Sequence, residues 1–158
     1  MDRLVVPFST RAEFQMHLAT CLSHAEHTLQ MFDPDYDIWE LGHSGTDAGL
    51  RRFLQNGGRL QLAAHEGKRL ERDAPRFLRL LRDYGHLIEV RRTSKSLRQL
   101  TDSFCIADQF HIVRRFHADH FRGEAAFNSP QDTRTSLERF LTIWLESGPG
   151  LLANSTGL

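Results

Sequence analysis

The sequence of 158 residues has few of the features that assign a function directly. Its 20 basic and 20 acidic residues give a formal net charge of zero, so no global electrostatic argument favours nucleic acid or membrane binding. No apolar run approaches the roughly 20 residues that span a bilayer, and residues 1–9 lack the long apolar region of a signal peptide. Cys21 and Cys105, the two cysteines, lie in apolar stretches and are expected to be buried thiols. We therefore expect a cytoplasmic, reduced protein without a membrane span.

Familiar catalytic and metal-binding motifs are also missing. There is no Gly-x-Ser-x-Gly nucleophile elbow, no Walker loop and no dinucleotide-binding fingerprint. His117, Asp119 and His120 offer three ligands within four residues, but this spacing, without a second cluster, does not match a zinc site. The acid-rich loop at 33–40 lacks the spacing and central glycine of a calcium loop. We expect no metal and no cofactor.

Hydrophobic periodicity predicts that residues 1–158 form a single α/β domain. Apolar stripes at helical spacing predict a helix that starts at Thr10, a second that ends at Asn56 and a third capped by Asp73. A fourth helix, opened by Ser129-Pro130, is expected to turn Leu137, Phe140, Leu141, Trp144 and Leu145 inward. Short apolar runs predict strands at 28–33, 59–65, 87–92, 103–108 and 111–115.

The order of these elements is α-β-α-β-α-β-β-β-α, which indicates a mixed sheet with helices on both faces. The last two strands are separated by Gln109-Phe110, which predicts a tight hairpin. Ligands bind at the carboxyl ends of strands in open α/β sheets. Asp33 and Trp39, which follow the first predicted strand, are therefore candidates for a pocket.

Basic residues are concentrated in the middle of the chain, where 13 of the 20 lie between residues 51 and 98. This segment is either a solvated helix face or part of an anion site. Strand alternation places His111 and Arg115 on one sheet face and Arg114 on the other. With Arg122 from the next loop, His111 and Arg115 would suit a phosphate or a carboxylate. The alternatives are edge charges that limit aggregation and burial of one arginine against Asp108 or Asp102.

With this element order, the chain resembles one repeat of the phospholipase D superfamily. In that family the first strand of the hairpin carries His-x-Lys-x-x-x-x-Asp. Asp108 matches the aspartate, and counting back places Ser103 at the lysine and Thr101 at the histidine. The family's later Gly-Ser turn and asparagine correspond to Gly123 and Asn128, over a longer interval. The segment 102–149 is also similar to an uncharacterised family of proteobacterial domains, themselves similar to inactive phospholipase D repeats.

The resemblance implies the loss of a phosphodiesterase site. In active relatives the histidine attacks phosphorus, the lysine binds the phosphoryl oxygens, and two motifs face each other, so that a single repeat must form a dimer. Thr101 does not supply a nucleophile with a pKa near neutrality, and Ser103 provides no cation for the developing charge.

We therefore expect a non-catalytic phospholipase-D-like domain that binds an anionic ligand or a protein partner. Nucleic acid is one such ligand, although the overall charge gives it little support. Two alternatives stay open. One is a phosphodiesterase or nuclease that uses His111, His117 and His120. The other is a structural module that forms a homodimer.

Overall fold

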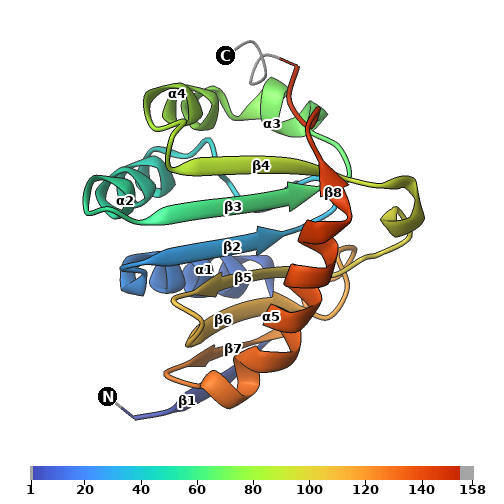
Figure 1. Cartoon of the computed structure of the whole chain (residues 1–158). Coiled ribbons are helices and arrows are strands. Elements are labelled where there is room, and N and C mark those ends of the chain that lie inside the picture. Colours follow the sequence, from blue (N-terminus) through green and yellow to red (C-terminus); the bar gives the residue numbers. More distant parts are fainter. Residues whose placement is uncertain (1, 154–158) are drawn as a thin grey trace.

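Eight strands form one mixed sheet across residues 2–153, the part of the chain that the computed structural model describes (Figure 1). Their order in the sheet is β1-β7-β6-β5-β2-β3-β4-β8. Strands β2, β3 and β4 are parallel, and every other neighbouring pair is antiparallel. The strands are β1 (Leu4–Phe8), β2 (Thr28–Phe32), β3 (Arg59–Ala64), β4 (Ile88–Thr93), β5 (Ser103–Ala107), β6 (His111–Arg115), β7 (Gly123–Phe127) and β8 (Ser147–Gly148).

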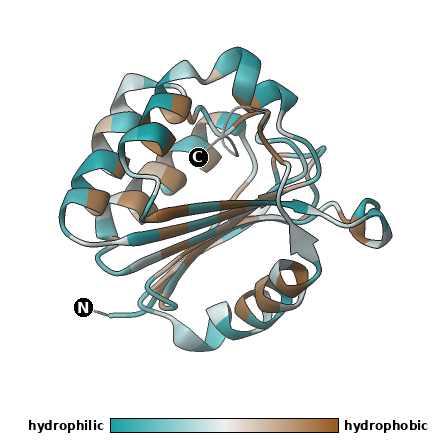
Figure 2. Ribbon diagram, turned by 45° about the horizontal axis from the view of Figure 1, so that its top comes forward, coloured by the Kyte–Doolittle hydropathy of each residue, from teal (hydrophilic) through white to brown (hydrophobic). Residues whose placement is uncertain are grey.

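Helices cover both faces of the sheet, as the sequence predicts (Figure 2). The helices are α1 (Arg11–His24), α2 (Ser44–Gln55), α3 (Lys68–Asp73), α4 (Pro75–Asp83) and α5 (Pro130–Leu145), with a 3₁₀ turn, η1 (Lys95–Leu97). The side chains of Thr10 and Glu13 form a reciprocal capping box at the start of α1. At the end of α2, Gly57 has a φ of 90°, which glycine adopts without steric cost.

Two apolar clusters hold these layers together. The larger one lies between the sheet and helices α1 to α4, and it buries both Cys21 and Cys105 completely. The smaller one lies under α5, where Phe104, Phe140 and Trp144 meet. Alternate residues of β2, β3, β5, β6 and β7 enter different clusters, so the sheet separates two cores.

Strands β1, β7 and β8 are additions to the predicted order. Strand β1 carries Pro7, which is tolerated because β1 lies at the edge of the sheet. Strand β7 has the sequence GEAAF, which has weak strand propensity. Gly123 opens it because a Cβ atom there would lie 2.0 Å from the carbonyl oxygen of Arg114. These strands depend on long-range pairing, which local sequence does not reveal.

Helical details also differ from the sequence-based expectations. Asp73 is the last residue of α3, and the cap of α4 is Ala74, which makes no side-chain capping bond. Leu141 and Leu145 are 46% and 81% exposed rather than buried. Each follows a sheet-facing residue and therefore lies about 100° further round the helix. Among residues 2–153, no helix has both the length and the apolar character needed to cross a membrane.

Candidate functional site at the carboxyl edge of the sheet

The carboxyl ends of β2, β3 and β4 meet the start of β5 at one edge of the sheet (Figure 1). Asp33 follows β2, His65 follows β3 and Thr93 ends β4. Ser103 begins β5 and lies opposite Arg115, the last residue of β6. All five of these side chains are buried. We call this end of the sheet the carboxyl edge. In open α/β sheets it is the usual place for a ligand.

A buried ion pair between Asp33 and Arg115 occupies the centre of the carboxyl edge. Their atoms Oδ1 and Nη2 are 2.8 Å apart, and the side chains are 1% and 2% exposed. The Nε of Arg115 donates to the hydroxyl of Ser103 at 3.3 Å. Its Nη1 donates to the carbonyl oxygens of Ala118 and His120 at 2.6 and 3.3 Å. Arg115 therefore fastens loop 116–122 to the sheet.

Asp33 receives hydrogen bonds on both carboxylate oxygens. The amide groups of Asp35 and Tyr36 donate to Oδ2 at 3.0 and 2.7 Å, and the indole of Trp39 donates to Oδ1 at 3.1 Å. Burial raises the pKa of Asp33, while Ser103, Arg115 and the two amides oppose that rise. Asp33 and Trp39, the two pocket candidates from the sequence, thus bind each other below the surface.

The three motif positions lie along β5 in the predicted order. Thr101 precedes the strand by two residues, Ser103 begins it fully buried, and Asp108 follows its last residue. Asp108 and Gln109 have φ angles of 55° and 63°, typical of the tight hairpin turn expected between β5 and β6. The backbone carbonyl of Thr101 accepts a hydrogen bond from the amide of Ala118 at 2.7 Å, which brings loop 116–122 against it.

Asp108 has a structural role at the opposite, amino end of β2. Its carboxylate accepts hydrogen bonds from three consecutive backbone amides, those of Glu26, His27 and Thr28, at 2.9, 2.7 and 3.0 Å. These bonds tie the β5–β6 turn to the segment between α1 and β2. Because the carboxylate is a charged acceptor, each bond is stronger than one between neutral groups.

The three candidate anion-binding residues lie in different surroundings. His111 and Arg115 share one face of β6 as predicted, but they occupy opposite ends of the strand. His111 Nδ1 accepts a hydrogen bond from the amide of Asn128 at 3.0 Å, and its ring lies 5.3 Å from that of His24. Burial lowers the pKa of His111, and His24 lowers it further. Arg122 is exposed in loop 116–122.

The acids considered from the sequence as partners of a buried arginine have other contacts. Asp102 pairs with Arg139 of α5 at 2.6 Å, and Asp108 binds backbone amides. The partner of Arg115 is Asp33, 82 residues away in the chain. Sequence reasoning missed this pair because strand order, rather than local spacing, brings the two residues together.

Two of the three alternative catalytic histidines lie close together. The rings of His117 and His120 are 5.2 Å apart in loop 116–122, whereas His111 is at the far end of β6. His117 Nδ1 accepts a hydrogen bond from the amide of Asp119 at 3.0 Å. Across residues 2–153, no three His, Cys, Asp or Glu side chains gather as metal ligands would.

Exposed cations lie at the end of β4 and on the segment that includes η1; Figure 1 shows this segment extending beyond the carboxyl edge. Arg92, Lys95 and Arg98 are all exposed, and none forms an ion pair within the described chain. Arg98 Nε donates to the carbonyl oxygen of Thr93 at 3.4 Å. The high density of basic residues between 51 and 98 was the sequence signal for this surface.

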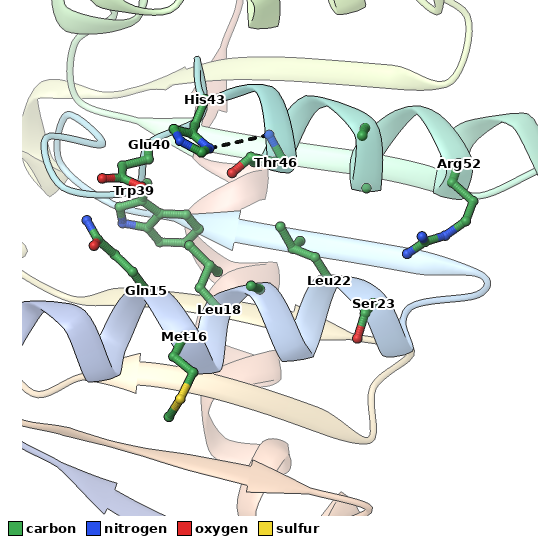
Figure 3. Close-up of a pocket in the computed structure, with 14 residues that line it drawn as sticks. Gln15, Met16, Leu18, Leu22, Ser23, Trp39, Glu40, His43, Thr46 and Arg52 are labelled. Atoms are coloured by element: carbon green, nitrogen blue, oxygen red, sulfur yellow. Dashed lines mark hydrogen bonds between the residues drawn. The ribbon is translucent and has the colours of Figure 1, made fainter.

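A separate groove of about 520 Å³ lies between α1 and α2 (Figure 3). Trp39, Leu18 and Leu22 lie along it, and Arg52 marks one end. The polar side chains at the other end contact protein atoms: Gln15 donates to the carbonyl oxygen of Ile38. Trp39, a pocket candidate from the sequence, thus lies along this groove. Sequence reasoning did not find the rest of it, which is lined by small residues on the facing sides of the two helices: Ala19, Gly45, Ala48 and Gly49.

Comparison of the sequence with models of known protein families assigns the chain to one family. Residues 10–151 match the family model described as "Domain of unknown function (DUF7931)". The chain belongs to this family. No curated protein matches the sequence.

Solved structures share the fold at low sequence identity. The chain is similar to Nuc from Salmonella typhimurium, a phospholipase D family member, with a TM-score of 0.67, 14% identity and coverage of 92% of this chain and 97% of that one. It is similar to NucT from Helicobacter pylori, with a TM-score of 0.65, 8% identity and coverage of 94% and 100%. It is also similar to TrmBL2, described as an archaeal chromatin protein with a novel mode of DNA binding, with a TM-score of 0.68, 11% identity and coverage of 91% and 53%. The chain thus spans about half of the TrmBL2 chain, and its fold is that of phospholipase-D-like proteins.

Proposed function

We propose that this chain is a non-catalytic phospholipase-D-like domain that binds an anionic ligand at its carboxyl edge. The observation that carries the proposal is the environment of Ser103. It is fully buried at the position of the family lysine and accepts a hydrogen bond from Arg115, whose partner is Asp33. The site of phosphoryl transfer in active relatives would then be filled by a structural ion pair.

The chemistry of Thr101 and Ser103 supports the same conclusion. A threonine hydroxyl needs an adjacent general base to become a nucleophile, and within the described residues no hydrogen bond joins the Thr101 side chain to a histidine. A serine at the lysine position offers no positive charge to a phosphoryl group in the transition state, where one such donor contributes roughly 3–4 kcal/mol. Both losses together would remove the family reaction.

Anion binding is supported by the cations around this edge. The side chain of Arg115 is committed to protein oxygens, so it acts indirectly by fastening the loop that carries Arg122. The ligand would meet Arg122 together with Arg92, Lys95 and Arg98, which are exposed. A nucleic acid suits such a spread of charges, because each phosphate neutralised releases counterions. The description of TrmBL2 as DNA-binding makes nucleic acid the first ligand to test.

The binding experiment measures fluorescence anisotropy of labelled single- and double-stranded oligonucleotides between about 50 and 200 mM salt. Arg122→Ala and the pair Lys95→Ala/Arg98→Ala are expected to weaken binding and to reduce the salt slope by about one for each phosphate that the variant no longer neutralises. Arg134→Ala, on the exposed side of α5, is the matched control and should bind like the wild type. Equal affinity in all variants, or no binding at either salt, would contradict the proposed site.

The alternative enzyme is tested with a phosphodiester substrate, in the presence of divalent metals and then of a chelator. The observation in its favour is the close pair of His117 and His120. We expect no turnover. Turnover that disappears in His117→Ala or His120→Ala would replace the non-catalytic proposal with a relocated active site.

Light scattering on the same samples tests the homodimer, which a purely structural module would form without any ligand.

A further inference from the structure

The polar side chains at the amino ends of β2, β3 and β4 form a second recess, remote from the carboxyl edge. It measures about 520 Å³ and is lined by Thr28, Arg59, Gln61, His86 and Glu89 together with the backbone before β4. This volume lies within the range of small-molecule sites. The exposed cations of the proposed anion surface lie at the other end of the sheet. Of the three motif positions only Asp108 lies at this end, where its carboxylate binds backbone amides.

One row of residues across the sheet shows how the recess arises. Register places Ile112, Ile106, Gln30, Gln61 and Glu89 side by side on five neighbouring strands. The two isoleucines are buried in the cluster beneath α5. The row becomes polar at β2, so the face covered by α5 gives way there to an amide and carboxylate surface.

Two buried polar atoms on β2 lack hydrogen-bond partners within residues 2–153. They are the hydroxyl oxygen of Thr28 and Oε1 of Gln30. Gln30 is 6% exposed, and its Nε2 donates to Gln61 Oε1 at 3.2 Å, so the amide is held in place while its own oxygen has no donor. Burying a polar atom without a partner destabilises a fold, and native proteins retain few such atoms. Thr28 lines the recess, whereas Gln30 is linked to it only through Gln61. The unpartnered Thr28 hydroxyl therefore points to a ligand that supplies the missing donor.

The charged groups at the rim define the rest of the ligand. Arg59 is exposed, and its side chain makes no ion pair or hydrogen bond within the described chain. Glu89, on the other side, is paired with Arg91 at 2.8 Å. The free charge in the recess is therefore positive, and it suits a carboxylate, which accepts bidentate hydrogen bonds from a guanidinium.

We propose that this recess binds a small carboxylate that also carries hydroxyl or amide donors. The carboxylate contacts Arg59, and a donor reaches the Thr28 hydroxyl, which also lines the recess. The groove between α1 and α2 does not make the same case, because in the described part of the chain none of its lining residues has a buried polar side-chain atom without a partner.

The experiment uses three probes that separate the two halves of this ligand. D-gluconate carries a carboxylate and hydroxyl donors, acetate carries the carboxylate alone, and D-glucose carries hydroxyls alone. An NMR titration follows the amides of residues 28–30, 59–61 and 85–89. Gluconate is expected to give saturable shifts there, with acetate and glucose each weaker by about tenfold or more, because each lacks one set of interacting groups.

Two substitutions and a control locate the binding groups. Arg59→Gln removes the exposed cation and is expected to weaken gluconate binding about tenfold. Thr28→Val replaces the unpartnered hydroxyl with a methyl group, so it should weaken gluconate binding while raising the urea midpoint of the free protein. Arg79→Gln, on exposed α4 across the sheet, should change neither.

Three results would overturn the proposal. The first is the absence of saturable shifts with gluconate. The second is an equal response to acetate, which would indicate a simple anion contact. The third is unchanged gluconate affinity in Arg59→Gln. Arg59 is exposed, so Arg59→Gln should not disturb folding. The proposal can therefore be tested even if Thr28→Val does not fold.

Discussion

The two ends of the sheet treat buried polar groups in opposite ways. At the carboxyl edge, both oxygens of Asp33 accept hydrogen bonds, and Arg115 is bound by four protein oxygens. At the amino end, within the part of the chain that the structure describes, Thr28 and Gln30 each have a buried polar atom without a hydrogen-bond partner. The polar groups of the first arrangement bind one another, whereas the second leaves hydrogen-bonding capacity for a ligand. The difference places the structural contacts at the carboxyl edge of the sheet.

We expect the largest loss of stability from a substitution in the ion pair at the carboxyl edge. Arg115→Ala leaves Asp33 as a buried carboxylate without its cation, and loss of one partner of a buried pair costs about 3–5 kcal/mol. It also frees the carbonyl oxygens of Ala118 and His120, so loop 116–122 loses its anchor. Urea unfolding measures the change in the free energy of unfolding.

Two further variants show whether the charge pair itself causes this loss. Asp33→Asn combined with Arg115→Met removes both charges, while the side-chain amide oxygen still accepts a hydrogen bond from the nearby donors. It should be more stable than Arg115→Ala because no unpaired ion remains. Arg134→Ala is exposed and should lie within about 0.5 kcal/mol of the wild type. If Arg115→Ala unfolds at the wild-type midpoint, the ion pair does not hold this edge together.

An intermediate effect is expected from Asp108, which connects the hairpin to the amino end of β2. Asp108→Ala removes the acceptor for three backbone amides, and hydrogen bonds to charged groups contribute about 1.5–3 kcal/mol each before compensation by water. Because these amides are partly exposed and water replaces some bonds, we expect a net loss of about 2 kcal/mol. Urea unfolding measures this change.

Asp108→Asn is the matched variant, because its amide keeps one oxygen acceptor. It should fall between the wild type and Asp108→Ala. If Asp108→Ala lowers the free energy of unfolding as much as Arg115→Ala does, the contacts at the carboxyl edge do not contribute more stability than those of the hairpin turn. No loss at all would mean that the turn is held by the backbone alone.

The sequence predicted features of this fold that depend on local spacing. Alternation placed His111 and Arg115 on one face of β6, the capping box at Thr10 marked the start of α1, and the hairpin followed from the short interval after Ala107. Local spacing could not predict the features that depend on the order of strands in the sheet. The pairing of Asp33 with Arg115 needs β5 between β2 and β6, and β7 forms because Gly123 admits the backbone of Arg114. The unpartnered oxygen of Gln30 likewise depends on which part of the sheet α5 leaves uncovered.

The smallest expected effect concerns pH and the histidines around α1. His17 and His111 are buried, and burial lowers the pKa of both from the ordinary value of 6.5. Glu13 opposes the shift at His17, and Asp108 opposes it at His111, where His24 adds to it. With both pKa values lower in the folded state, the unfolded chain binds protons first as the pH falls through 6.5.

The free energy of unfolding should therefore decrease between about pH 7 and pH 5, and stop changing below the folded pKa values. Urea midpoints at several pH values measure this slope. His111→Asn, whose side-chain oxygen can replace Nδ1 as acceptor for the Asn128 amide, and His17→Gln should each make the slope shallower. Arg134→Ala, at an exposed position on α5, should leave this slope unchanged. If both histidine variants keep the wild-type slope, other groups cause the pH dependence of the free energy of unfolding. His17 and His111 would then not contribute to it.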